Sequence, residues 1–208
     1  MLVQDKTMNA FFRSRAAVAA ALLAASACAQ AADFTLSGSI GFHNDVVQID
    51  FSRAFAGDVK IWTDSWMSGL NFDPTAALWA KSGADFAFLQ AVDDDDTVAA
   101  GQGFYDSGFA LPSLAAGAYR LTLAAAVNAP SGALLSQGFA YSAETPIPIG
   151  QWNQPTYDPN ANDQKGGFWQ VHFSNVDQTA LAVPEPSSWL LLAVGLAALA
   201  VRRGAGVR

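Results

Sequence analysis

The sequence has 208 residues, of which 51% are hydrophobic and 14% charged, and its formal net charge is −7. Most of the basic residues lie near the two ends, so residues 33–182 carry 5 Lys and Arg against 16 Asp and Glu, a formal charge of −11. This acidity argues against nucleic acid and anionic membranes as partners of that segment. Its 150 residues suit a single domain.

The N-terminal region has the order of a secretory signal peptide. An apolar run over residues 16–27 follows several basic residues and precedes the small residues of Ala29-Gln30-Ala31. The run is shorter than the roughly 20 residues of an ordinary membrane span. We therefore predict that residues 1–32 form a helical signal peptide, which signal peptidase removes after Ala31 or Ala32.

Cys28 is the only cysteine in the sequence. It lies before the predicted cleavage position and would leave with the signal peptide. The mature protein would then contain no disulfide, and its hydrophobic core would have to stabilise it alone.

The central segment has the pattern of short β-strands. Apolar and polar side chains alternate over residues 47–52, 119–123 and 169–173, which is the period of a half-buried strand. Turn sequences such as Ser82-Gly83 and Lys165-Gly166-Gly167 separate these runs. Seven or eight short strands without a helical pattern predict an all-β fold, a single β-sandwich or jelly-roll domain over residues 33–182.

Residues 34–127 resemble bacterial pre-peptidase C-terminal domains, which are β-sandwiches. Asn71-Phe72-Asp73-Pro74 stands where that family has Gly-Phe-Asp-Pro, and Leu114–Tyr119 fits its Leu-x-x-Gly-x-Tyr strand entry. The Asp93–Asp96 run stands where the family has an Asn-Asp-Asp loop. The sequence differs in Asn71 and in an insertion over residues 85–92.

The most prominent polar feature is the run of Asp93, Asp94, Asp95 and Asp96. Adjacent carboxylates repel one another unless water or a hard cation separates their charges, and Ca²⁺ binds oxygen ligands from flexible loops. Two interpretations remain open: a solvated acidic loop tip, or a Ca²⁺ site that these residues form with Asp73. Asp106 and backbone carbonyls are candidates to complete such a site.

Aromatic residues suggest a second kind of site. Trp152 and Tyr157 lie in the proline-rich segment 145–159, and a tryptophan and tyrosine held in a loop are suited to stack on sugar rings. The alternative is that such aromatic side chains belong to the hydrophobic core.

The sequence gives no support to nucleophilic or zinc-dependent catalysis. It contains no Gly-x-Ser-x-Gly motif, and His43 and His172 are its only histidines, too few for a zinc site without carboxylates. His172 falls on the polar phase of its predicted strand. The domain has a single glutamate, Glu144, so a pair of carboxylates for glycoside hydrolysis would have to come from aspartates. We predict that the protein is not an enzyme.

The C-terminal region combines three features. Pro184-Glu185-Pro186 is followed by Trp189, by an apolar run over residues 190–201 and by Arg202-Arg203. The prolines favour an extended segment, and the apolar run predicts a short transmembrane helix with its basic end on the cytoplasmic side. A plain membrane anchor is the alternative interpretation.

This order resembles the PEP-CTERM protein-sorting signal, also known as an ice-binding-protein C-terminal domain. The resemblance implies that an exosortase removes residues 183–208 in a Gram-negative bacterium that produces exopolysaccharide. Pro184, Glu185, Pro186, Arg202 and Arg203 are the residues that match the signal.

Together these features predict an exported protein. It would pass through an intermediate tethered to the inner membrane and then reach the cell surface or the extracellular space. There it would have a structural or adhesive role in the extracellular matrix, the exopolysaccharide or biofilm, with exopolysaccharide as a partner. A Ca²⁺-assisted carbohydrate-binding module and a secreted glycosidase are the alternatives.

Overall fold

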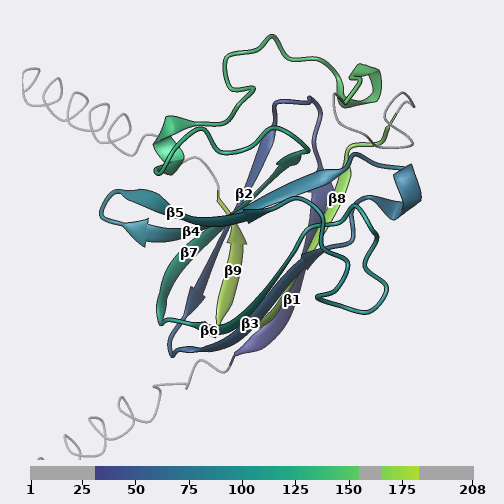
Figure 1. The fold of residues 1–208 in the computed structure, drawn as a ribbon. Coiled ribbons are helices and arrows are strands. Elements are labelled where there is room, and N and C mark those ends of the chain that lie inside the picture. The colour runs from purple at the N-terminus through teal and green to yellow at the C-terminus, as the bar shows by residue number, and fades with distance from the viewer. Residues whose placement is uncertain (1–30, 155–164, 183–208) are drawn as a thin grey trace, which may run out of the picture.

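The computed structural model describes residues 31–154 and 165–182. In these ranges nine antiparallel strands form two sheets that pack face to face (Figure 1). The four-stranded sheet has the order β1-β8-β3-β6, with β1 Ala32–Ser39, β8 Phe168–Val176, β3 Gly57–Thr63 and β6 Gly108–Leu114. The five-stranded sheet has the order β5-β4-β7-β2-β9, with β5 Asp85–Val92, β4 Pro74–Ser82, β7 Gly117–Ala125, β2 Val46–Arg53 and β9 Gln178–Leu181.

This architecture confirms the predicted all-β sandwich. Helical structure in the described ranges consists of short 3-10 turns, η1 Met67–Gly69, η2 Leu135–Gln137 and η3 Ile149–Gln151. In these ranges no helix has the length and apolar character needed to cross a membrane. The predicted signal helix and C-terminal helix lie outside the described residues.

The strand alternation seen in the sequence defines the core between the sheets. Val171 and Phe173 of β8 are fully buried, as are Ile49 of β2 and Leu121 of β7. Phe51 of the five-stranded sheet lies against Phe173 of the other, with 5.3 Å between ring centroids. Burying one such side chain contributes roughly 1.5–3 kcal/mol, so a core of this kind can stabilise a domain that has no disulfide.

Strand β4 is buried on both of its faces, unlike the alternating strands. Leu78 faces the core between the sheets, whereas Trp79 belongs to a second cluster with Phe86 and Phe139 on the outer face of the five-stranded sheet. The chain around η2 covers that face, and Trp79 donates a hydrogen bond from Nε1 to Thr122 Oγ1 at 3.0 Å. A strand with both faces covered has an uninterrupted apolar sequence, which is what residues 76–80 show.

Strands β4 and β5 form a hairpin, and its register places the candidate site. Ser82 pairs with Asp85 across a two-residue turn, in which Gly83 has a φ of +58°. Glycine adopts this left-handed conformation without steric cost, as the predicted Ser82-Gly83 turn required. At the other end of the hairpin Ala76 pairs with Val92, so the residues before β4 and those after β5 lie side by side.

Candidate metal site

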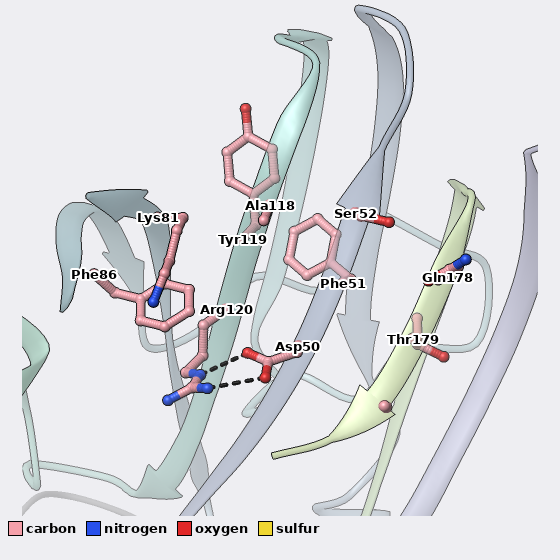
Figure 2. Close-up of a pocket in the computed structure, with 11 residues that line it drawn as sticks. Asp50, Phe51, Ser52, Lys81, Phe86, Ala118, Tyr119, Arg120, Gln178 and Thr179 are labelled. Atoms are coloured by element: carbon pink, nitrogen blue, oxygen red, sulfur yellow. Dashed lines mark hydrogen bonds and ion pairs between the residues drawn. The ribbon is translucent and has the colours of Figure 1, made fainter. Parts of the chain in front are cut away.

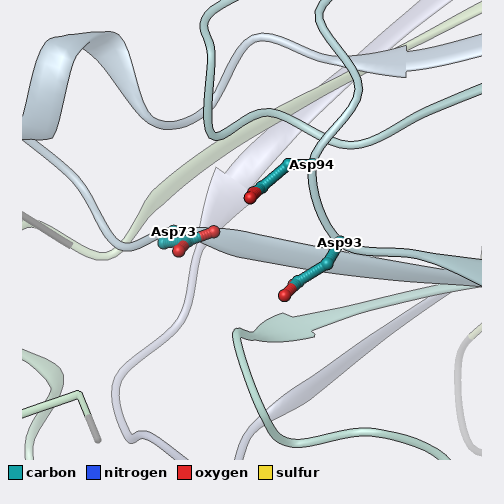
Figure 3. A group of neighbouring side chains, drawn as sticks. All are labelled: Asp73, Asp93 and Asp94. Carbon is teal, nitrogen blue, oxygen red and sulfur yellow. The ribbon is translucent and has the colours of Figure 1, made fainter. Parts of the chain in front are cut away.

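Three aspartates converge where β4 begins and β5 ends. Asp73 comes directly before β4, and Asp93 and Asp94 come directly after β5 (Figure 3). One carboxylate oxygen from each residue lies within 4.8 Å of the corresponding oxygens of the other two. The hairpin register therefore brings Asp73 next to Asp93 and Asp94, the first two residues of the acidic run.

The three carboxylates lie in an environment that disfavours their ionised form. Burial raises the pKa of Asp73 to about 7; the hydrogen bond from Gln154 opposes this, and the charges of Asp93 and Asp94 raise the value further. The Asp93 and Asp94 side chains are exposed, but partial desolvation of their carboxylates still raises the pKa of each. Lys165 partly compensates, since its charge lowers the pKa of Asp73.

Asp95 and Asp96 are not part of this group. Asp95 Oδ1 accepts hydrogen bonds from the backbone N–H of Thr97 at 2.9 Å and from its hydroxyl at 2.6 Å, which caps the local turn. Asp96 is exposed. Of the five aspartates predicted to bind calcium, the structure thus places three together and leaves two apart.

Asp106, the further candidate, organises the neighbouring loops. Its side chain is fully buried, and Oδ1 accepts hydrogen bonds from Thr63 Oγ1 at 2.7 Å, Ser65 N at 2.7 Å and Trp66 N at 3.2 Å. Its Oδ2 accepts from Gly103 N at 3.2 Å. Most of these donors are distant in sequence, so no local pattern could have revealed this role.

The predicted aromatic site is only partly described. Trp152 is half-buried and packs against the core. The centroid of its ring lies 5.3 Å from that of His43 and 6.0 Å from that of Tyr141. His43 is fully buried: Nδ1 accepts from Ile147 N, and Nε2 donates to Glu144 Oε2, both at 3.1 Å. Trp152 therefore helps to enclose this histidine, and Tyr157 lies outside the described residues.

The other histidine lies on the outer face of the four-stranded sheet, as the strand alternation predicted. The His172 ring stacks on Trp62 at 4.9 Å between centroids, and its Nδ1 is 3.0 Å from Thr35 Oγ1. Both rings are half-buried. The two histidines therefore lie in separate surroundings and do not form a joint metal site.

A shallow groove of about 410 Å³ lies on the outer face of the five-stranded sheet (Figure 2). Asp50 of β2 and Arg120 of β7 line it as neighbours on adjacent strands, joined by hydrogen bonds of 2.6 Å and 2.9 Å. The Arg120 guanidinium and the Lys81 ammonium both lie over the Phe86 ring. Among the described residues that line this groove, Asp50 is the only carboxylate.

The Asp50–Arg120 pair yields a prediction of modest size. Replacing Arg120 with Met should lower the free energy of unfolding by about 1 kcal/mol, because the ion pair is partly exposed and the aliphatic chain still covers Phe86. Urea denaturation at neutral pH measures this change. Lys81→Met, which removes a charge over the same ring but no ion pair, is the matched control and should change the stability less. A larger loss for the control would contradict this assignment.

The class of the protein follows from the fold and from one sequence match. The described chain is an antiparallel β-sandwich with a cluster of carboxylates at one end. Residues 182–204 match the PEP-CTERM protein-sorting motif, which confirms the predicted sorting signal. The motif implies an exported protein that an exosortase sorts. Its matching residues Pro184, Glu185, Pro186, Arg202 and Arg203 lie outside the described ranges.

Comparison with solved structures finds similar chains at low identity. A mitogen from Yersinia pseudotuberculosis has 10% identity, with 71% of this chain and 89% of that chain covered and a TM-score of 0.39. The pre-peptidase C-terminal domain of a collagenase from Bacillus anthracis has 12% identity, with 72% and 90% covered and a TM-score of 0.35. PliG of Aeromonas hydrophila, a periplasmic inhibitor of g-type lysozyme, has 12% identity, with 73% and 88% covered and a TM-score of 0.31.

No curated protein matches the chain.

Proposed function

We propose that this protein is a non-catalytic structural or adhesive component of the cell surface or the extracellular matrix. The observation that carries the proposal is the match of residues 182–204 to the PEP-CTERM sorting motif. In this scheme signal peptidase removes residues 1–32, and the tail tethers the protein to the inner membrane until an exosortase cleaves it. Residues 33–182 are then the mature domain, and exopolysaccharide is its partner.

The groove described on the five-stranded sheet does not have the carboxylate pair of a glycosidase. A glycosidase needs two carboxylates roughly 5–10 Å apart on either side of the scissile bond. The groove on the five-stranded sheet offers Asp50 alone among its described lining residues, and Arg120 already holds that carboxylate. Asp73, Asp93 and Asp94 do not line this groove.

The gathering of Asp73, Asp93 and Asp94 favours a second candidate function, Ca²⁺-assisted carbohydrate binding. A cation held at a surface can coordinate sugar hydroxyls directly or hold the loops that contact the sugar. Glycan-array binding that disappears with a chelator and returns with added Ca²⁺ would favour this function over a purely structural role. Binding that is unaffected by the chelator would exclude calcium assistance.

The intact mass of the protein recovered from its host tests the first proposal. We expect both ends to be missing, with the N-terminus at Ala32 or Asp33 and the C-terminus between Val183 and Ser187. Cleavage at the C-terminus should depend on the sorting triplet. Retention of the chain through Arg208 would show instead that the tail is a plain membrane anchor.

A pair of variants separates sorting from general proteolysis. Glu185→Ala changes the centre of the triplet and should leave the tail attached. Ser188→Ala, which introduces the same residue just outside the triplet, should be processed like the natural protein. Equal processing of both variants would contradict recognition of the triplet.

A further inference from the structure

The side chain of Asp73 is buried, and within the described ranges one of its two oxygens has no hydrogen-bond partner. The residue is 3% exposed, and its Oδ2 accepts a hydrogen bond from Gln154 Nε2 at 2.9 Å. Among the residues that the structure describes, no donor reaches its Oδ1. Figure 3 shows an oxygen of Asp73 directed towards the Asp93 and Asp94 side chains. A buried carboxylate oxygen costs several kcal/mol unless a hydrogen bond or a cation satisfies it.

Asp73 cannot easily move this oxygen to solvent, because its main chain is held in place. Its carbonyl oxygen accepts a hydrogen bond from Ala126 N at 2.8 Å. The next residue, Pro74, begins β4 and pairs with Ala125 of the adjacent strand. The main chain of Asp73 is therefore held by the sheet and does not belong to a free loop.

Asp93 and Asp94 are also held by the scaffold. The Ser107 hydroxyl lies 2.7 Å from the Asp93 carbonyl oxygen and 2.6 Å from that of Pro74, which links the two sides of the hairpin end. Asp95 N donates to the carbonyl oxygen of Asp106 at 2.8 Å. These contacts keep the acidic run next to Asp73 in spite of the repulsion between their charges.

From this geometry we infer that Asp73, Asp93 and Asp94 bind one Ca²⁺ ion, with Asp73 as the buried ligand and the other two on the solvent side. The three groups supply oxygen donors alone, which suit a hard cation and not zinc. Water enters the remaining positions from the exposed side of Asp93 and Asp94.

The three carboxylates lie close enough together to share one Ca²⁺ ion. Two ligands on opposite sides of Ca²⁺ lie about 4.6–5.2 Å apart, twice the usual Ca–O distance, whereas around Mg²⁺ they lie only about 4.0–4.2 Å apart. The oxygens of the three aspartates lie within 4.8 Å of one another, which Ca²⁺ accommodates with little movement. Ca²⁺ also accepts irregular sets of oxygen ligands, whereas Mg²⁺ requires near-octahedral geometry and gives up its bound water reluctantly.

A site with three carboxylates and open solvent positions belongs to the weaker range of calcium sites. Dissociation constants of about 10⁻⁴–10⁻³ M are typical of extracellular modules. The ion would join the start of β4 to the end of β5 and, through Gln154, to the segment after η3. This inference concerns the folded domain and does not depend on the proposed sorting or on a glycan partner.

Titration of the chelator-treated mature protein with CaCl₂, followed by calorimetry and by the thermal midpoint, tests the inference. We expect one ion per chain with a dissociation constant of about 10⁻⁴–10⁻³ M, a midpoint that rises with CaCl₂, and a smaller rise with MgCl₂. No saturable binding up to about 10 mM CaCl₂ would overturn the inference, since an extracellular site must fill in that range.

Variants separate a specific site from general attraction by an acidic surface. Asp73→Asn and Asp94→Asn should each weaken Ca²⁺ binding at least about tenfold, because each removes one charged ligand. Asp96→Asn removes the same charge from the same run but no proposed ligand, and should bind Ca²⁺ like the natural protein. An equal loss in Asp96→Asn and in Asp73→Asn would mean diffuse screening and would overturn the site. Circular dichroism of each variant establishes that the fold is retained.

Discussion

In the presence of a chelator, Asp73→Asn is expected to make the domain more stable near pH 8 by about 4 kcal/mol, the largest gain that we predict for a single substitution. The reason is the buried charge. Burial raises the pKa of Asp73 from 3.8 to about 7, so the folded state binds a proton more tightly than the unfolded state. Asparagine has a similar shape and does not ionise, so the variant avoids the cost of burying a carboxylate.

The sign of the pH dependence follows from the raised pKa of Asp73. Below pH 3.8 the carboxyl is protonated in both states and costs nothing; between pH 3.8 and about 7 the unfolded state ionises first, and the free energy of unfolding falls. Above that window the full cost is present. The difference in stability between Asp73→Asn and the natural protein should therefore grow from pH 4 to pH 7 and then level off.

Urea denaturation in EDTA across this pH range measures that difference. Asp96→Asn serves as the matched control, because Asp96 is exposed and lies outside the group of three carboxylates. Its stability should follow that of the natural protein. A lower stability of Asp73→Asn than of the natural protein at high pH would show that the buried, ionised Asp73 carboxylate does not destabilise the folded state.

Asp106→Ala should have the largest destabilising effect, a loss of roughly 3–5 kcal/mol in the free energy of unfolding. The Asp106 carboxylate is fully buried and accepts hydrogen bonds from Thr63 Oγ1 and from the backbone of Ser65, Trp66 and Gly103. Alanine leaves these donors without an acceptor in a place that water does not readily reach, and each unsatisfied donor costs about 1–3 kcal/mol.

Asp106→Asn is a smaller change at the same position. It keeps one oxygen that can accept from Thr63 and Ser65, so its loss should be smaller than that of alanine. Equilibrium denaturation near neutral pH compares the two. A loss below about 1 kcal/mol for Asp106→Ala would show that the two loops do not depend on this carboxylate.

Some features of the candidate metal site can be predicted from the local sequence, and others cannot. A run of four aspartates is visible in the sequence, and so is the turn before β4 that contains Asp73. Which members of the run meet Asp73 depends on the β4–β5 register, because side chains leave a strand end in different directions. Asp95 caps a turn with Thr97 instead, a choice that the composition of the run does not reveal.

The aromatic residues illustrate the same limit. Trp152 lies in a segment rich in proline, which is compatible with an exposed platform. In the structure it packs beside His43 and against the core. Burial of a loop aromatic depends on what the rest of the chain places above it, and sequence periodicity carries no information on that.

The sequence by itself determined the C-terminal sorting motif and the all-β class. Those features are local: a short apolar run with its flanks, a Pro-Glu-Pro triplet, and side chains that alternate along a strand. Only the tertiary structure decided that β4 is buried on both faces, that Asp106 anchors two loops, and that Asp73 meets Asp93 and Asp94. Each of these depends on contacts between segments distant in the chain, which strand pairing and packing set and which no local pattern encodes.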